Sequence, residues 1–342
     1  MQKPAVMTIK LKKLADQVLV ITGASSGIGL TTAEMAAERG ARVVLNSRNE
    51  ADLRDAVGRI RERGGSATYY VGDVADPGAM ERLAEHALSE FGTFDTWVNN
   101  AGISIYGRLT DVPLADKRRL FDVNFWGVVH GCRAAIPHLS IRGGAIINIG
   151  SEVSERAVPV QVMYSASKHA VKGYTDGLRM ELEEEGFPIS VTLVKPGATN
   201  TQFIDHARTY MTRDPELPGP VYAPEEVAHA ILRCAERPVR DVTVGGVTTL
   251  NVAMGMLAPR LTDYYMERKM FQAQQKEYGT GRPDALDEPT RDGSRRGSTE
   301  QRELKRATLT RIALSDAGRL LPYVAVGGAV AAIGARWLRR AG

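Results

Sequence analysis

Short apolar runs alternate with longer segments of helical periodicity along the first part of the chain. The apolar runs predict seven strands, at residues 17–22, 41–46, 67–72, 95–100, 144–150, 189–195 and 241–246. The segments between them predict helices at residues 29–39, 50–63, 77–91, 113–139, 163–185 and 224–237. Strands rich in Val and Ile on both faces are typical of a parallel sheet that helices cover on two sides. Because crossovers between parallel strands are right-handed, this order predicts an α/β fold with a doubly wound seven-stranded sheet and helices on both faces.

The pattern changes after about residue 244 and predicts a C-terminal extension. Residues 251–279 are amphipathic and predict accessory helices outside the sheet. Residues 280–305 are polar, lack aromatic side chains and are rich in Gly, Pro, Ser and charge. That composition predicts a flexible linker. Residues 306–342 then form a tail that is partly basic and partly apolar.

The tail contains a candidate membrane-associated helix over residues 320–338. Its apolar part, residues 320–335, has no charged side chain. A membrane span needs about 20 apolar residues, so this run is short, and its many Ala and Gly residues make it weakly hydrophobic. A spanning tail would also export Arg336, Arg339 and Arg340, against the positive-inside tendency. A membrane span, a shallow membrane anchor and a soluble docking helix therefore remain as alternatives.

Composition and charge exclude several classes of function. The chain has 342 residues, of which 43% are hydrophobic, so it can bury a sizeable core. Its net charge of +4 arises in residues 291–342, where 11 Lys or Arg outnumber 4 Asp or Glu and leave −3 for the rest. The main domain thus lacks the basic surface that nucleic-acid binding requires. Cys132 and Cys234 are too few for a disulfide framework or a zinc site, so we expect no metal. No signal peptide precedes the first strand, which predicts a cytoplasmic protein.

The first predicted strand leads into three closely spaced glycines, Gly23, Gly27 and Gly29, in "TGASSGIG". The N-terminus of a helix offers free N–H groups and partial positive charge, and a pyrophosphate can bind there if no side chain blocks it. We expect Gly23 to allow the turn, Gly27 to let the backbone approach phosphate, and Gly29 to let the helix pack on the sheet. The spacing differs from the commoner G-x-G-x-x-G fingerprint. For this loop alone, an ordinary glycine-rich turn is the alternative.

A second candidate site lies in "YSASK", where Tyr164 and Lys168 are four residues apart on one face of a predicted helix. A free tyrosine has a pKa near ~10, and a neighbouring ammonium lowers it. The pair is therefore a candidate proton donor and acceptor. Ser151, in "INIGS", follows a strand at the edge where open α/β sheets bind ligands. Taken alone, the pair could equally be a surface tyrosine beside a solvated lysine.

These motifs, in this order, resemble those of the short-chain dehydrogenase/reductase family, single-domain nicotinamide oxidoreductases with a Rossmann fold. "TGASSGIG" matches the family's phosphate loop, and "NNAG" matches the motif that closes the cofactor cleft after the fourth strand. "NFWG", "IGS", "YSASK" and "PGATNT" follow in register. The resemblance runs from about residue 11 to residue 246. It implies that residues 11–250 form an NAD(P)-binding catalytic domain.

The resemblance also implies a reaction: hydride transfer between a nicotinamide and a carbonyl or secondary alcohol. Tyr164 is then the general acid/base, and Ser151 hydrogen-bonds the reacting oxygen. Lys168 lowers the tyrosine pKa and holds the nicotinamide ribose, and Asn124 holds a water of the proton relay. The alternative for Asn124 is a residue that kinks or caps a helix. The family further implies a small-molecule substrate and a homo-oligomer.

The end of the second predicted strand indicates which cofactor is preferred. A carboxylate there binds the ribose hydroxyl of NAD, whereas an arginine accommodates the 2′-phosphate of NADP. Ser47 stands where NAD-dependent relatives have aspartate, and Arg48 follows it. Since a guanidinium can bind phosphate through two hydrogen bonds, we expect NADP rather than NAD. The alternative is that Arg48 only begins the next helix in solvent.

The resulting site prediction has two parts. The catalytic residues are Asn124, Ser151, Tyr164 and Lys168. In the cofactor site, Asp73 contacts the adenine and Val74 packs beside it. The full predicted cofactor-binding set is Gly23, Ser25, Ser26, Gly27, Ile28, Gly29, Ser47, Arg48, Asp73, Val74, Asn100, Ala101, Gly102, Tyr164, Lys168, Pro196, Gly197, Thr199 and Thr201.

The predicted lid limits the class of substrate, and the motifs leave two alternative functions to compare. Residues 200–222 lie where the family has a variable lid, which mixes apolar residues such as Phe203 with charge, and His206 there is expected to be a surface or substrate-lining residue and not a catalytic one. An apolar alcohol or ketone is compatible with this segment. A non-catalytic dinucleotide-binding scaffold or sensor, recruited by its tail, is the main alternative, and an epimerase or dehydratase is another. The intact set of Ser151, Tyr164 and Lys168 favours the oxidoreductase.

Overall fold

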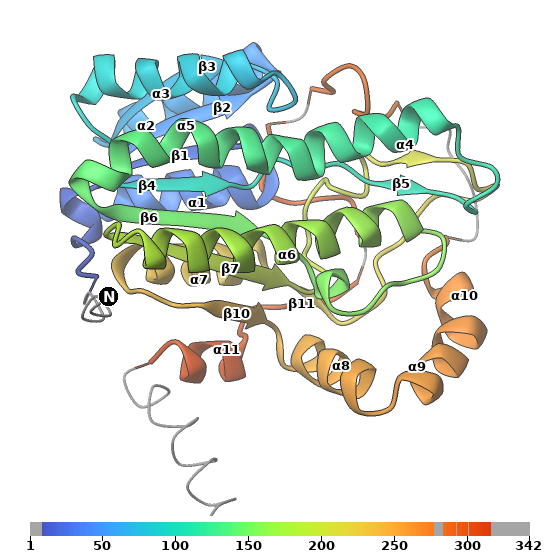
Figure 1. Cartoon of the computed structure of the whole chain (residues 1–342). Coiled ribbons are helices and arrows are strands. Elements are labelled where there is room, and N and C mark those ends of the chain that lie inside the picture. The colour runs from blue at the N-terminus through green and yellow to red at the C-terminus, as the bar shows by residue number, and fades with distance from the viewer. Residues whose placement is uncertain (1–8, 277–282, 292, 300, 316–342) are drawn as a thin grey trace, which may run out of the picture.

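A seven-stranded parallel sheet forms the centre of the molecule, in the order β10-β7-β6-β4-β1-β2-β3 (Figure 1). The computed structural model describes residues 9–276, 283–291, 293–299 and 301–315. All seven predicted strands are present, which confirms the doubly wound fold. They are β1 (Val18–Thr22), β2 (Arg42–Ser47), β3 (Ser66–Val71), β4 (Thr96–Asn99), β6 (Gly144–Ile149), β7 (Ile189–Pro196) and β10 (Asp241–Val244).

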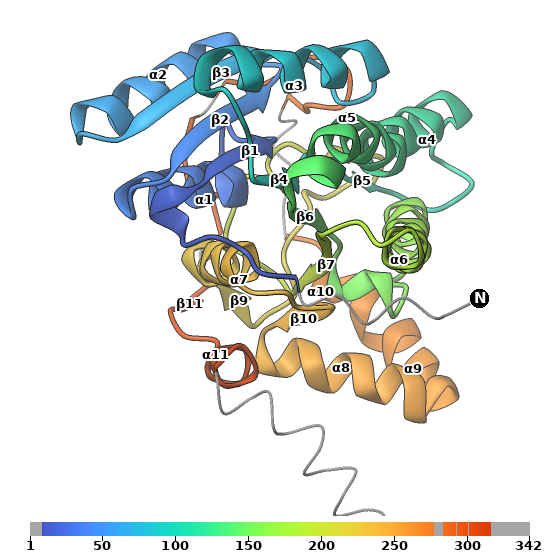
Figure 2. The ribbon, with the colours of Figure 1, turned by 60° about the vertical axis from the view of Figure 1, so that its left-hand side comes forward.

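Helices cover both faces of this sheet, and Figure 2 shows them as two layers. The first layer holds α1 (Gly27–Glu38), α2 (Glu50–Glu62) and α7 (Pro224–Glu236). The second holds α3 (Pro77–Phe91), α4 (Leu114–Phe121), α5 (Gly127–Arg142) and α6 (Val162–Glu184). Along β1, Leu19 and Ile21 pack against the first layer, and Val18 and Val20 against the second. Because both faces are buried, the strand is apolar at every position from Val18 to Ile21.

The strand order reverses between β1 and β4, and this creates a crevice at the carboxyl edge of the sheet. β2 and β3 lie on one side of β1, whereas β4, β6, β7 and β10 lie on the other. The loops that follow β1 and β4 must therefore diverge. Ligands of open α/β sheets bind at such a point.

The helix predicted over residues 113–139 contains an irregularity. α4 and α5 are continuous, but the turn between them, Asp122–Trp126, is a π-helix. A π-turn holds one extra residue and is frequent at functional sites. Asn124 lies at its centre, so the sequence pattern located the helix but not its distortion.

Additional helices lie at one end of the molecule, at the lower right of Figure 1. They are α8 (Gly246–Leu257), α9 (Pro259–Tyr265), a π-turn (Met266–Met270) and α10 (Phe271–Ala273). They occupy the stretch in which accessory helices were expected. In the part of the chain that the structure describes, no helix is long and apolar enough to cross a membrane. The candidate helix over 320–338 lies outside the described residues.

The prediction of a flexible linker over 280–305 is wrong for the residues that the structure describes there. Leu286 is 1% exposed and belongs to the hydrophobic core beneath α3, α5 and α6. β11 (Glu303–Leu304) pairs with β9 (Val221–Tyr222), and α11 (Thr308–Ala313) packs beside β10. A second short pair joins β5 (Ile105–Tyr106) to β8 (Arg208–Thr209). Several polar side chains and amides of the segment bind the domain through hydrogen bonds and ion pairs, although many of its residues are exposed.

Candidate active site

A cavity of about 670 Å³ opens at the carboxyl edge of the sheet and gathers nearly all of the predicted site residues. Of the predicted set, Gly29 and Asn124 alone do not line it, and both lie directly behind its wall. The loop after β1 forms one side and the loops after β6 and β7 the other. The sequence motifs thus converge in space although they are far apart along the chain.

The backbone geometry after β1 requires glycine. Gly23 has a φ of +63° and Gly27 a φ of +55°, both in the left-handed region. A Cβ on Gly29 would lie 2.2 Å from the carbonyl oxygen of Gly23, so only glycine lets α1 begin so close to β1. Ser26 precedes the helix and makes no side-chain capping bond. The amides of Ile28 and Gly29 donate to none of the described residues, as an anion-binding helix N-terminus requires.

Ser151, Tyr164 and Lys168 meet on the opposite wall of the cavity. Ser151 follows β6, and its Oγ accepts a hydrogen bond from the amide of Val153 at 3.3 Å. Tyr164 lies in the first turn of α6, with Lys168 one turn later. The Lys168 ammonium donates to the carbonyl of Ile149 at 2.8 Å and lies 5.8 Å from the centre of the Tyr164 ring. The two side chains therefore share a face, as their spacing predicts.

Burial controls the protonation of this pair. It raises the pKa of Tyr164 to about 12, while a hydrogen bond with Ser151 acts in the opposite direction. It lowers the pKa of Lys168 to about 8, because the buried ammonium is poorly solvated. We expected Lys168 to lower the tyrosine pKa. The tyrosine pKa is raised instead, because desolvation of the phenolate is the largest cause and the hydrogen bond with Ser151 is what acts against it.

Asn124 supports this wall from behind. It is 0% exposed, and its Oδ1 accepts from the amide of Ile103 at 2.8 Å. Its Nδ2 donates to the carbonyl of Ile103 at 2.9 Å and to Ser167 Oγ at 3.2 Å. A Cβ on Gly102 would lie 3.5 Å from Asn124 Oδ1 and 3.7 Å from Lys168 Nζ. The π-turn thus places the amide of Asn124 close to the lysine while it fixes the loop after β4.

The other end of the cavity is polar and lies beyond β2. The Arg48 guanidinium donates to the carbonyls of Ala285, Leu286 and Asp287. Its burial lowers its pKa. Its Nε–H and one Nη2–H donate to none of the described residues. Asp73 accepts from the amide of Ala75 at 2.9 Å and pairs with Arg119, so its carboxylate is held in place.

The cavity fits an adenine dinucleotide on structural grounds. The uncapped N-terminus of α1 can hold a pyrophosphate. Two lining residues, Asn46 and Thr290, have buried oxygens, Oδ1 and Oγ1, with no hydrogen-bond partner among the described residues. Such atoms are costly in a folded protein unless a ligand or water satisfies them.

Two of the groups of lining residues that sequence reasoning missed come from the C-terminal extension. Tyr265, Met266 and Met270, from α9 and the following π-turn, border the end of the cavity near Tyr164. Their amphipathic pattern signalled a helix but not its position. Ala285, Pro289, Thr290 and Gln301 come from the predicted linker, which carried no signal of a site. In the predicted lid, Phe203 and His206 line the cavity, with the Phe203 ring centre 5.3 Å from that of Tyr164.

Comparisons with known proteins show which family the chain is similar to. A family model described as "short chain dehydrogenase" matches residues 17–211. The uncharacterized oxidoreductase YxnA of Bacillus subtilis is 48% identical over 280 residues, which cover 81% of this chain and 79% of that protein.

Two solved structures are also similar. One is a short chain dehydrogenase/reductase from Burkholderia phymatum in complex with NAD, with a TM-score of 0.65 and 26% identity over 77% of this chain and 98% of that one. The other is a gluconate 5-dehydrogenase from Burkholderia cenocepacia in complex with NADP and tartrate. Its TM-score is 0.60 and its identity 30%, over 70% of this chain and 97% of that one. Relatives with either cofactor therefore share this fold.

Proposed function

Because the chain belongs to the short-chain dehydrogenase/reductase family and is an NAD(P)-dependent oxidoreductase, we propose that it transfers a hydride between NADP(H) and a carbonyl or secondary alcohol, with Tyr164 as general acid/base. One observation carries the proposal. Ser151, Tyr164 and Lys168 line the same cavity as the glycine loop after β1. A proton donor and a phosphate-binding loop thus face one space.

When bound, the nicotinamide supplies or accepts the hydride. The Tyr164 hydroxyl gives its proton to the oxygen of a ketone as that oxygen gains negative charge, and it takes a proton from an alcohol in reverse. Ser151 donates a hydrogen bond to the same oxygen, where charge develops. Lys168 holds the nicotinamide ribose, and its positive charge favours the phenolate of Tyr164 in the alcohol-oxidising direction.

Asn124 acts on this proton path as a positioning residue. Its side chain fixes Ile103, and its Oδ1 and Lys168 Nζ approach the same side of Gly102, 3.5 and 3.7 Å from where a Cβ would lie. We propose that it holds a water that exchanges protons with the ammonium. Its buried position in the π-turn supports a structural role at the same time.

The preference for NADP rests on the end of β2. No carboxylate occupies this strand end: Ser47 and Arg48 stand there and line the cavity. Three carbonyls orient the Arg48 guanidinium, and two of its N–H groups donate to none of the described residues and are available to another acceptor. Two donors are what a bidentate contact with a 2′-phosphate needs.

The substrate end of the cavity favours an apolar alcohol or ketone. Val153, Phe203, Met266 and Met270 line it. The main alternative function is a non-catalytic dinucleotide sensor. A sensor has no need of a proton donor, so the position of Tyr164 in the cavity argues for catalysis.

A panel of ketones and secondary alcohols tests this function. Purified protein is mixed with each compound and with NADPH, NADH, NADP or NAD, and the absorbance of the reduced nicotinamide is followed. We expect turnover of apolar substrates, faster with the NADP(H) pair. Binding of either cofactor without turnover of any compound would support the sensor instead.

The family, the cysteines and the tail suggest the cellular setting of the protein. The family resemblance suggests a homo-oligomer, and the free, buried Cys132 and Cys234 suit a reducing, cytoplasmic compartment. The apolar run at 320–335 motivates membrane association through the tail. Liposome flotation compares the full chain with a chain ending at Ser315. If the tail is a membrane anchor, only the full chain floats with the liposomes; if it is a docking helix, neither chain floats.

A further inference from the structure

The part of the chain that follows the accessory helices runs across the carboxyl edge of the sheet. We call residues 283–299 the covering segment, meaning the described residues 283–291 and 293–299. In Figure 1 it is the orange-red trace that leads past the strand ends to β11. The covering segment lies outside residues 17–211, which the family model matches. Its contacts therefore belong to this chain's own extension.

At its beginning, the covering segment is tied to the adenosine end of the cavity. Arg48 holds the carbonyls of residues 285–287, and Arg119 binds the Leu286 carbonyl at 3.1 Å. Asn49 Nδ2 donates to the carbonyl of Thr290 at 3.0 Å. Arg48 follows β2 and Arg119 binds Asp73 after β3, so the segment joins the two loops predicted to hold the adenosine.

Farther along, the covering segment reaches the phosphate loop. The amide of Gly27 donates to the carbonyl of Ser294 at 2.9 Å. The amide of Gly297 donates to Asn200 Oδ1 at 3.2 Å, and a Cβ on Gly297 would lie 2.3 Å from the Thr201 carbonyl oxygen. The segment thus contacts both the loop after β1 and the loop after β7, which approach each other where Thr201 lies beside Gly27.

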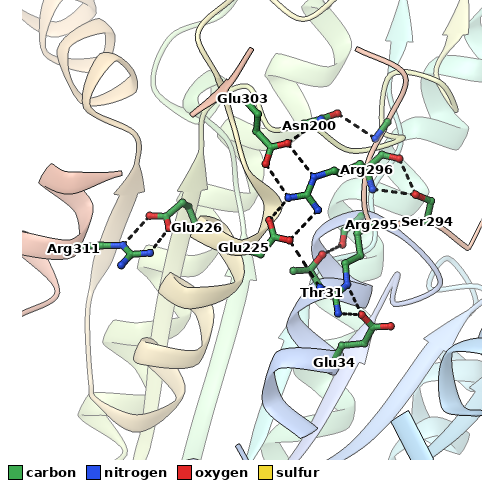
Figure 3. Close-up of polar contacts among 12 residues, drawn as sticks. Thr31, Glu34, Asn200, Glu225, Glu226, Ser294, Arg295, Arg296, Glu303 and Arg311 are labelled. Carbon is green, nitrogen blue, oxygen red and sulfur yellow. Dashed lines mark hydrogen bonds and ion pairs between the residues drawn. The ribbon is translucent and has the colours of Figure 1, made fainter. Parts of the chain in front are cut away.

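Two arginines fasten this part of the segment to the first helix layer (Figure 3). Arg295 pairs with Glu34 of α1, whose side chain is only 4% exposed. Arg296 donates two hydrogen bonds to Glu225 of α7, at 3.0 and 2.9 Å, and two more to Glu303, at 3.0 and 2.9 Å. Paired guanidinium–carboxylate contacts of this kind fix geometry as well as adding stability.

We propose that the covering segment forms the outer wall of the dinucleotide site and encloses the bound cofactor, so that the cofactor leaves only when the segment opens. The inference rests on the proposed function. Ala285, Pro289 and Thr290 line the cavity, and Thr290 Oγ1 is buried without a partner among the described residues. At the N-terminus of α1, the segment accepts a hydrogen bond from the amide of Gly27. The amides of Ile28 and Gly29 donate to none of the described residues, so they are available to an anion. The segment therefore borders the phosphate site without filling it.

The test measures cofactor release directly. NADPH is bound to the full-length protein, its fluorescence gives the dissociation constant, and rapid displacement by excess NADP gives the dissociation rate. The double variant Arg295→Gln/Arg296→Gln removes the ion pairs that hold the covering segment to α1 and α7. It leaves the residues that line the cavity unchanged. We expect its NADPH dissociation rate to rise at least about tenfold, since removing partly buried ion pairs acts mainly on release.

Arg311→Gln is the matched control. Arg311 pairs with Glu226 of α7 as Arg295 pairs with Glu34, but none of the described residues of α11 lines the cavity. This control should release NADPH at the wild-type rate. Gly297→Ala is a second variant that keeps every ion pair and pushes the segment away from Thr201. It should also accelerate release.

The outcomes separate this inference from the function on which it rests. Faster NADPH release in both variants of the covering segment, with an unchanged rate in the control, supports the proposal that the segment encloses the cofactor. Wild-type release rates in both variants overturn it and leave the oxidoreductase intact. Tighter NADPH binding in the variants also overturns it, because the segment would then compete with the cofactor. If the wild type binds neither NADPH nor NADH, the proposed function fails, and the inference fails with it.

Discussion

Tyr164 and Lys168 are both buried, and burial moves their pKa values in opposite directions. The tyrosine pKa rises to about 12 and the lysine pKa falls to about 8. A proton therefore stays on the hydroxyl at neutral pH, which suits donation to a ketone oxygen. The lysine is the group of this pair that titrates nearer to neutrality.

The buried lysine has a measurable effect on stability. In the folded protein its pKa is about 8, against 10.5 for a free lysine. Below pH 8 the folded state bears the full cost of the buried charge, and this cost disappears as the pH rises to 10.5. The stability of the wild type relative to Lys168→Met should therefore rise by up to about 3 kcal/mol across that window. Urea unfolding of the cofactor-free proteins measures this, and a constant difference would contradict the assignment.

Arg48 is predicted to select the 2′-phosphate. Hydrogen bonds to charged groups contribute about 1.5–3 kcal/mol, which is roughly tenfold to a hundredfold in affinity. Arg48→Ala should therefore lower the affinity for NADPH by about that factor more than the affinity for NADH.

Arg119→Ala is the control for this measurement, because Arg119 also binds the Leu286 carbonyl but lies outside the cavity lining. It should leave the ratio of the two affinities unchanged. Equal losses of NADPH and NADH affinity in Arg48→Ala would show that Arg48 only anchors the covering segment.

At the scale of elements, local pattern was enough for the sheet and its helices. The inner strands β1, β4, β6 and β7 are buried at every position, which explains their mostly apolar sequences, whereas the edge strands β3 and β10 are only partly buried. The glycine loop was predictable for a different local reason: the turn brings Gly29 so close to the carbonyl oxygen of Gly23 that a Cβ has no room. The π-turn at Asn124 was not, because helical periodicity carries no sign of the π-turn or of the hydrogen bond that Asn124 accepts from Ile103, 21 residues away.

The covering segment shows where local pattern fails. Its polar composition is that of a linker, but its partners are distant: Arg48 and Leu286 are 238 residues apart. The segment is held by carboxylates of α1 and α7 and by loop arginines, and no periodicity within it records them. Among the predicted site residues, all of which come from short motifs or strand ends, all but Gly29 and Asn124 line the cavity. The lining residues from the extension could be seen only in three dimensions.

At the scale of the whole molecule, the extension up to Ser315 is part of the folded domain. Leu286, Ala307 and Leu314 are buried in the two hydrophobic clusters. Burial of a leucine contributes about 1.5–3 kcal/mol. A chain ending at Gly279 should therefore lose several kcal/mol of stability and bind cofactor poorly, whereas a chain ending at Ser315 should match the full chain. Thermal unfolding compares the full chain with the two shortened chains. If the chain ending at Gly279 is as stable and active as the full chain, residues 280–305 are a linker, as the sequence predicted.

The central claim is that the cavity performs proton-coupled hydride transfer and does not only bind a dinucleotide. Tyr164→Phe tests it, with Tyr174→Phe on the same helix but outside the cavity lining as the control. With a substrate from the panel, kcat of Tyr164→Phe should fall by about 10²–10⁴-fold while its NADPH affinity stays near that of the wild type. The control should retain kcat. A Tyr164→Phe variant that turns over at the wild-type rate would contradict the account.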